Sequence, residues 1–310
     1  AVGLDPSLTE SYMYLGIAHA ELSRYAEAIP LLDKSLATNP SLIEGLIYRA
    51  KSLIMTGRYA EAIETDDKIL SLNPTLIDIW MQKGDAQFAL NKKQDAILAY
   101  AKALEINANF ADGWVKKGNA LYDLGRIQVS VVAYTRALDI NPALRDIWMR
   151  KGDALYGLGR TEDAISAYTK SLKIDPDQAD GWVRNGKALF DLGRYQDAID
   201  SFDNAIALNQ RCIEAFNYKG LALEKVNRID ESIHTFEILL EIDPRNGAAH
   251  YHKGLSLALQ GDHRHAITAF EKTIEILPSF APAYYNKGRS LIHGGKYLDA
   301  IAAFDRALEI

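Results

Sequence analysis

The residues of this sequence that could do chemistry begin with five histidines between residues 250 and 293, namely His250, His252, His263, His265 and His293. Imidazole nitrogens are common zinc ligands, but a zinc site needs three or four ligands that converge on one point. His250 and His252 are two residues apart, so on a helix their side chains point about 200° apart. We therefore predict no metal site and interpret His250 and His263 as replacements of aromatic residues.

The remaining nucleophiles and carboxylates follow no catalytic pattern. Cys212 is the single cysteine, so an intramolecular disulfide is excluded and a reducing, cytoplasmic location is expected. It falls in a predicted turn with no base beside it, which indicates an unreactive free thiol. The sequence contains no glycine-rich phosphate loop, no His-Glu-x-x-His and no Gly-x-Ser-x-Gly. We predict that this chain is not an enzyme and uses no cofactor.

Charge and hydropathy narrow the class of partner. The formal net charge of the 310 residues is −6, which argues against non-specific binding to nucleic acid. No apolar run approaches the roughly 18 residues that a membrane-spanning helix needs. We therefore expect a protein or peptide partner, with no nucleic acid and no membrane.

The elements that must position these residues are set by an internal period of 34 residues. Each of the following sets keeps that spacing. Prolines lie at Pro6, Pro40, Pro74, Pro142, Pro176, Pro244 and Pro278; glycines at Gly16, Gly84, Gly118, Gly152, Gly186, Gly220, Gly254 and Gly288; and all four tryptophans at Trp80, Trp114, Trp148 and Trp182. A fourth set holds only alanine or serine, and a fifth is mostly tyrosine or phenylalanine. Sets in phase over nine repeats indicate one repeated structural unit.

These residues resemble the tetratricopeptide repeat (TPR) family, whose pattern is W-x2-L-G-x2-Y…A-x3-F…P. The unit with Trp114, Gly118, Leu121, Ser130 and Tyr134 carries most of it. The chain departs by having lysine where the family has leucine before the glycine, and mostly leucine where it has tyrosine. The resemblance implies an all-α fold, a TPR α-solenoid in which helix-turn-helix repeats form a right-handed superhelix.

The period also predicts the domain organisation, a single TPR array over residues 1–310. Repeats begin at residues 9, 43, 77, 111, 145, 179, 213, 247 and 281, residues 1–8 are the remnant of an upstream repeat, and the last repeat is truncated. We number the positions of each repeat 1 to 34 from these starts. The incomplete ends lead us to expect a fragment of a longer array, able to stack head to tail on another copy through its truncated ends.

Each repeat is expected to form two short helices. Position 15 is glycine or asparagine in every repeat except the first, which has Ser23, and these residues tolerate the left-handed backbone that ends a helix. Position 31 is mostly asparagine or aspartate before proline, which ends the second helix. The lysines at position 7 are interpreted as structural, with the ammonium in water. The repeat that starts at Ile43 has Ala50 for glycine and Asp66 for the aromatic residue, so we predict weaker packing there.

In TPR proteins, positions 2, 5, 6, 9 and 13 of the first helix line the concave groove, and position 12 lies at its border. Four consecutive repeats place apolar and charged side chains on these positions. The candidate peptide-binding residues are Asp78, Met81, Gln82, Asp85, Phe88, Asp112, Val115, Lys116, Asn119, Tyr122, Asp146, Met149, Arg150, Asp153, Tyr156, Asp180, Val183, Arg184, Lys187 and Phe190.

Two of these positions have a second explanation. The carboxylates at position 2 form a negative ladder along the groove or simply favour the first turn of a helix through its dipole. The aromatic residues at position 12 contact a ligand or lie at the edge of the core. A clamp for a C-terminal carboxylate is not expected, because position 5 is never lysine and position 2 is never basic.

The function we predict is a protein-interaction scaffold that binds a peptide or protein segment along the concave groove. The alternative is the substrate-selecting or targeting region of a larger enzyme, such as a TPR-containing glycosyltransferase. RNA binding of the kind known for 35-residue pentatricopeptide repeats is excluded by the period and by the net charge. The identity of the partner does not follow from the sequence.

Overall fold

The structure, a computed structural model, describes residues 6–310, with side chains from Leu8 onward, and in this range it consists of α-helices without strands. The first helix of each pair, or A-helix, is α1 (Pro6–Glu21), α3 (Ile43–Met55), α5 (Ile77–Ala89), α7 (Ala111–Asp123), α9 (Arg145–Gly157), α11 (Ala179–Asp191), α13 (Ile213–Lys225), α15 (Gly247–Gln260) or α17 (Ala281–His293). The second, or B-helix, is α2 (Tyr25–Thr38), α4 (Tyr59–Leu72), α6 (Lys93–Ile106), α8 (Ile127–Ile140), α10 (Thr161–Ile174), α12 (Tyr195–Leu208), α14 (Ile229–Ile242), α16 (His263–Ile276) or α18 (Tyr297–Glu309). The predicted all-α solenoid of helix pairs is confirmed.

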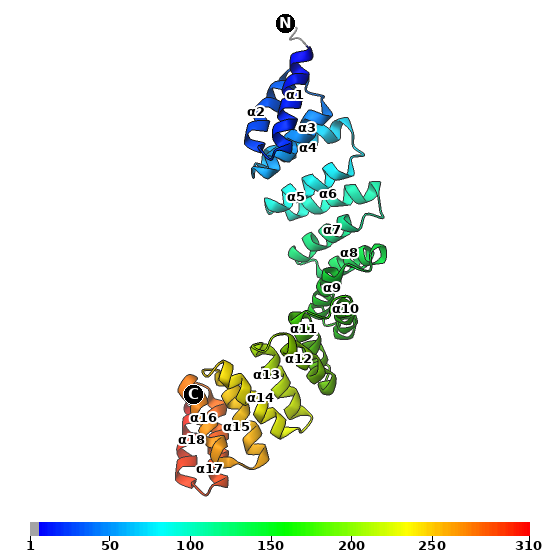
Figure 1. Cartoon of the computed structure of the whole chain (residues 1–310). Coiled ribbons are helices and arrows are strands. Elements are labelled where there is room, and N and C mark those ends of the chain that lie inside the picture. The colour runs from blue at the N-terminus through cyan, green and yellow to red at the C-terminus, as the bar shows by residue number, and fades with distance from the viewer. Residues whose placement is uncertain (1–5) are drawn as a thin grey trace. The chain divides into compact units, whose positions relative to one another are not determined.

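The chain forms two compact units, one ending at Leu158 and the other running from Gly159 to Ile310. Within each unit every helix packs against the next helix in chain order (Figure 1). In the second unit the A-helices α11, α13, α15 and α17 also contact one another in succession, so their exposed side chains share one surface. The boundary between the units falls inside the repeat that starts at Arg145.

Helix starts follow the 34-residue period. From α3 onward every A-helix begins at the first residue of its repeat, whereas α1 begins at Pro6, three residues before Thr9. Residues 1–5 lie outside the described part, and with them most of the predicted remnant at residues 1–8.

The turn between the two helices of each pair depends on position 15. All nine residues at this position have positive φ, including Asn91 at 58°, Asn227 at 61° and Ser23 at 59°. Glycine and asparagine adopt this conformation readily, but serine does so at a cost. The predicted end of the A-helix is therefore confirmed, and Ser23 adopts the same left-handed conformation as the glycines.

Asparagine or aspartate at position 31 shapes the turn after the B-helices from α2 to α12. Its side-chain oxygen accepts a hydrogen bond from the backbone N–H two residues on, as in Asn73 to Thr75 at 3.1 Å and Asn107 to Asn109 at 2.9 Å. This is an Asx-turn, which replaces the next helical turn with a side-chain bond. The predicted end of the B-helix is confirmed.

In seven of the nine helix pairs the core combines a glycine at position 8 with a large ring at position 24. A Cβ atom added to Gly118 would lie 2.6 Å from Cε1 of Tyr134, and one added to Gly220 would lie 2.5 Å from Cζ of Phe236. Both distances are well inside van der Waals contact, so the ring fills the volume that a side chain would need. The glycine is required for this close approach.

The repeat that starts at Ile43 replaces both members of that pair. Ala50 and Asp66 are each 0% exposed, so the methyl group is accommodated where the ring is replaced by a shorter side chain. The exchange leaves Asp66 with one acceptor bond, from Gln82 Nε2 to Oδ1 at 2.8 Å, and with Oδ2 buried without a partner. Burial raises the pKa of this carboxyl to about 7. The weaker stability of this repeat stays a prediction, with a buried carboxyl as its physical reason.

The tryptophans at position 4 join each A-helix to the preceding turn. The indole N–H of Trp80 donates to the carbonyl of Pro74 at 2.9 Å, and that of Trp114 to the carbonyl of Ala108 at 2.8 Å. His250 holds the same position, with Nε2 3.1 Å from the Pro244 oxygen. This bond supports the interpretation of His250 as a substituted aromatic residue.

The lysines at position 7 differ from the prediction, because most of their ammonium groups are paired. Lys83 reaches Asp67 at 2.5 Å and Lys253 reaches Glu237 at 2.9 Å, in each case a carboxylate sixteen residues earlier on the preceding B-helix. Lys117 has no carboxylate at that spacing, and burial lowers its pKa. Its ammonium lies 5.1 Å from the ring centre of Trp114. The role is structural, as predicted, but it is carried by charge pairing as well as by the methylenes.

Candidate functional site

We define the A-face as the side chains at positions 2, 5, 6, 9 and 13 of the A-helices, with position 12 at its edge. The predicted binding residues lie on this face, on α5, α7 and α9 of the first unit and on α11 of the second. They belong to two units, so each group forms its own surface.

An ion pair joins the A-helices α5 and α7. The Asp85 carboxylate accepts from Lys116 Nζ at 2.6 Å and from the Tyr100 hydroxyl at 2.8 Å. Asn119 Oδ1 accepts from the Tyr134 hydroxyl at 3.0 Å, and burial raises the pKa of this phenol to about 12. These contacts join position 9 of one repeat to the next repeat and to the core. They hold neighbouring pairs in register, and a ligand would have to compete with them.

Two residues of the predicted apolar strip are buried, which corrects their assignment. Met81 is 6% exposed and Val183 is 4% exposed. Met81 packs in a core cluster with Ile97 and Tyr100 of α6, the second helix of its own pair. Met81 and Val183 therefore belong to the core and not to the exposed A-face. Val115 and Met149 at the same position are half-buried.

The aromatic residues at position 12 lie at the edge of the core. Phe88, Tyr122, Tyr156 and Phe190 are all half-buried. Phe88 and Tyr122 pack against core clusters, and Phe190 makes edge contacts with Tyr195 at 5.3 Å and Tyr218 at 5.7 Å. These contacts support the core-edge explanation of position 12, and contact with a ligand stays a prediction.

The carboxylates at position 2 are exposed in the first turn of their helices, as the helix dipole favours. Asp146 pairs with Arg145 at 2.7 Å, and Asp112 lies 3.9 Å from Lys116. Asp78 and Asp180 are exposed in the same way. A negative ladder that contacts a ligand stays a prediction.

A pocket of about 570 Å³ in the first unit brings three predicted residues together. Asp112 and Val115 of α7 line it with Asp146 at the start of α9, over an apolar base that includes Leu144 and Ile147. Gln82, Arg150 and Asp153 are outside its lining. The lining also includes Arg145, so it is partly apolar and carries charges of both signs.

The residues predicted on α11 form a smaller polar surface. Lys187 binds Glu214 of α13 at 2.7 Å and lies 5.3 Å from the ring centre of Tyr218. The hydrogen bond to Glu214 raises the pKa of the lysine. Arg184 is exposed. These side chains line neither the pocket around Leu259 nor the pocket around Phe280.

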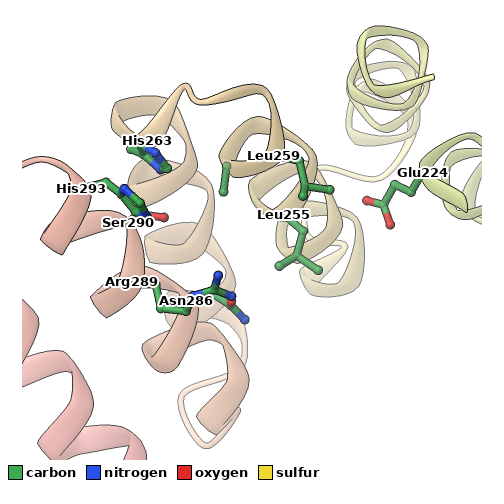
Figure 2. Close-up of a pocket in the computed structure, with 9 residues that line it drawn as sticks. Glu224, Leu255, Leu259, His263, Asn286, Arg289, Ser290 and His293 are labelled. Carbon is green, nitrogen blue, oxygen red and sulfur yellow. The ribbon is translucent and has the colours of Figure 1, made fainter. Parts of the chain in front are cut away.

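A second pocket lies farther along the second unit, on α13, α15 and α17 (Figure 2). Its volume is about 220 Å³. Leu255 and Leu259 of α15 form one wall and Glu224 of α13 stands across from them, while Asn286 and Arg289 project from α17. His263, at the start of α16, and His293, at the end of α17, close one end.

The sequence prediction placed no site residue in this pocket. Most of its lining lies on the A-face or at its edge, at positions 6, 9, 12 and 13, and positions 6, 9 and 12 are also those of residues predicted upstream. The available signal was Leu255 and Leu259, apolar side chains at positions 9 and 13, together with Arg289 at position 9 of the next repeat. The sequence prediction relied instead on the aromatic residues at position 12 of four similar repeats, which lie upstream of this pocket.

Two kinds of feature, metal-ligand clusters and membrane-spanning helices, are absent from the described part of the chain. Among residues 6–310, no three histidine, cysteine, aspartate or glutamate side chains are grouped so that they could hold a metal ion. None of the helices in this range is both long enough and apolar enough to cross a membrane.

Comparison with protein families identifies the repeat. A tetratricopeptide repeat model matches residues 115–179, 219–282 and 260–310, which together are just over half of the chain. A second tetratricopeptide repeat model matches residues 155–220. Residues 21–103 match the model described as anaphase-promoting complex, cyclosome, subunit 3. No protein with a curated description matches the chain.

Solved structures agree with the family models. A crystal structure of MamA is 32% identical, with a TM-score of 0.52, over 53% of this chain and 90% of that one. YrrB, described as a TPR protein with an unusual peptide-binding site, is 23% identical, with a TM-score of 0.56, over 61% and 97%. The C-terminal part of a TPR repeat-containing protein from Cytophaga hutchinsonii is 18% identical, with a TM-score of 0.64, over 78% and 98%. The last two similarities concern the fold alone.

Proposed function

We propose, from the premise that this chain belongs to the tetratricopeptide repeat family, that it is a protein-interaction scaffold that binds a peptide or protein segment along its A-face. One observation carries the proposal: the pocket on α13, α15 and α17 is lined on this face by the half-buried Leu255 and the exposed Leu259. Leu259 is 70% exposed, although each such leucine gains about 1.5–3 kcal/mol when buried. An exposed leucine beside a pocket is typical of a surface that a partner covers.

The pocket of the first unit supports the same proposal. It combines Val115 and Leu144 with the carboxylates of Asp112 and Asp146, which suits an apolar side chain beside a basic one. YrrB has a peptide-binding site by its description, and peptide binding by a helical repeat is the activity we propose here by analogy.

The proposed contribution of this chain is binding, without catalysis. If it is the targeting region of a larger enzyme, the same A-face would select the substrate, and a catalytic domain in the full-length gene would identify that arrangement. We propose a cytoplasmic setting on the ground that Cys212 is the single cysteine.

We also propose head-to-tail stacking of copies at high concentration. The α18 side chains Leu298, Ile301 and Leu308 are 83%, 57% and 85% exposed, and Tyr14 of α1 is 57% exposed. Analytical ultracentrifugation should show association that Leu298→Asp weakens. Equal sedimentation of the two proteins at all concentrations would contradict stacking.

The experiment for the main proposal is selection of peptides from a random displayed library, followed by binding measurements with single variants. Leu259→Asp places a charge on the A-face pocket, and Leu98→Asp is the matched control at a 57% exposed leucine of α6. We expect Leu259→Asp to abolish binding and Leu98→Asp to leave it unchanged. Equal effects of the two substitutions, or no enriched peptides, would refute the proposal.

A further inference from the structure

The A-face changes its charge before it reaches the pocket on α13, α15 and α17. Position 2 carries a carboxylate in the first seven repeats, but in α15 and α17 it is Ala248 and Pro282. Position 9, which is aspartate at Asp85 and Asp153 and lysine at Lys51 and Lys187, is Leu255 and Arg289 in the last two repeats. A chain of net charge −6 therefore has a locally apolar and cationic A-face in its last two repeats.

Arg289 is the charge on this surface that has no acidic partner. It is exposed, and its guanidinium lies 5.8 Å from the ring centre of Tyr285, which orients it by stacking. No carboxylate in residues 6–310 forms an ion pair with it. A guanidinium held in place and unpaired is ready to bind a carboxylate with two parallel hydrogen bonds.

Glu224, the acidic residue in the lining, is already engaged. Its carboxylate accepts from the Ser256 hydroxyl at 2.7 Å and lies 3.7 Å from Nδ1 of His252. Its side chain is 14% exposed. The group left to determine the charge of a ligand is therefore Arg289.

The closed end of the pocket holds unsatisfied polar groups. The rings of His263 and His293 stack with their centres 4.2 Å apart, and Nδ1 of His263 is buried without a hydrogen-bond partner. Asn286 uses its amide nitrogen to donate to the Tyr251 hydroxyl at 3.1 Å and to the Pro282 carbonyl at 2.9 Å. Its amide oxygen is left to accept from a ligand N–H. Buried polar atoms are rarely left unpaired, so the unpartnered His263 nitrogen is a second sign that this site accepts a ligand.

Size restricts what can enter. The volume of about 220 Å³ is below the roughly 300–1,000 Å³ of pockets that enclose a drug-sized molecule. It fits one or two side chains of a longer segment that continues along the A-face.

We propose that this pocket recognises an acidic residue next to an aliphatic residue in the partner segment. The carboxylate pairs with Arg289, and the aliphatic side chain lies against Leu255 and Leu259. This inference rests on the proposed function, because it assumes a peptide on the A-face, and it adds the chemical class of the peptide.

The test uses peptides selected on the wild-type chain from a random displayed library. We expect Asp or Glu beside Leu, Ile, Val or Met to be enriched. A synthetic peptide with that motif and its Glu→Gln counterpart are then titrated against wild type, Arg289→Gln and the control Arg136→Gln, an exposed arginine of α8. The acidic peptide should bind wild type about tenfold more tightly than its Gln counterpart, as a charge-assisted hydrogen bond predicts.

The double comparison separates a direct contact from a structural effect. With Arg289→Gln, the two peptides should bind equally, while Arg136→Gln should keep the tenfold difference. Enriched peptides without an acidic residue, or an acid preference that survives Arg289→Gln, would overturn this inference and leave the proposed function intact. A library that yields no enriched peptide would overturn both.

Discussion

Replacing Asp66 by asparagine should remove a pH dependence from the stability of this protein. Asp66 is 0% exposed, and burial raises its pKa from 3.8 to about 7. Between these values the folded chain keeps the proton that the unfolded chain has released. The unfolded state therefore binds fewer protons, and the free energy of unfolding falls as pH rises from about 4 to about 7.

The size of the effect follows from the difference between the two pKa values. A gap of about three units corresponds to about 4 kcal/mol, since each unit is about 1.4 kcal/mol. Asparagine keeps the shape and the acceptor for Gln82 Nε2 but does not ionise. The variant should gain up to about 4 kcal/mol relative to wild type between about pH 4 and about pH 7.5.

The assay is urea unfolding followed by circular dichroism at several pH values, reported as the difference between variant and wild type. Carboxyl groups common to both proteins cancel in that difference. Glu64→Gln, which removes an exposed carboxylate from the same helix, measures the effect of losing one charge. Parallel pH profiles for wild type and Asp66→Asn would refute the reasoning about the buried carboxyl.

Three further predictions concern the repeat itself. Gly118→Ala should destabilise by about 1–3 kcal/mol, because its Cβ would lie 2.6 Å from the Tyr134 ring; an unchanged melting temperature would contradict the close-packing argument. Ser23→Gly should stabilise by about 1 kcal/mol, since Ser23 has a φ of 59°, and lower stability in urea unfolding would show that this backbone is not strained. Trp114→Phe should cost about 1 kcal/mol or more through loss of its bond to the Ala108 carbonyl, and thermal unfolding equal to wild type would assign that bond no net energy.

The helix pairs could be predicted from the sequence because their determinants are local and repeated nine times. Position 15 is glycine or asparagine in eight of the nine repeats, which suits a left-handed turn, and most repeats end the second helix with asparagine or aspartate at position 31 and proline at position 32. These determinants are visible in most single repeats. The period then aligns them, which is why A-helix starts from Ile43 onward fall where the repeats were placed.

The candidate site was less predictable, because exposure and pairing depend on neighbours in space. Met81 and Val115 share position 5, yet only Met81 is buried. Asp85 and Lys116 looked like free groove charges, but they bind each other across repeats. Ala50 and Asp66 look like two independent departures in the sequence. The contact between glycine and ring in other repeats shows that they are linked, because the alanine methyl group needs the space that a ring would fill.

The most direct test of the central claim is to locate a bound peptide on the chain. A selected peptide carrying a photoreactive phenylalanine analogue is crosslinked, and the attached residues are identified by mass spectrometry. We predict crosslinks on A-helices α15 and α17, around Leu259 and Arg289. Crosslinks confined to the B-helices α14, α16 and α18 would contradict the assignment of the A-face as the binding surface.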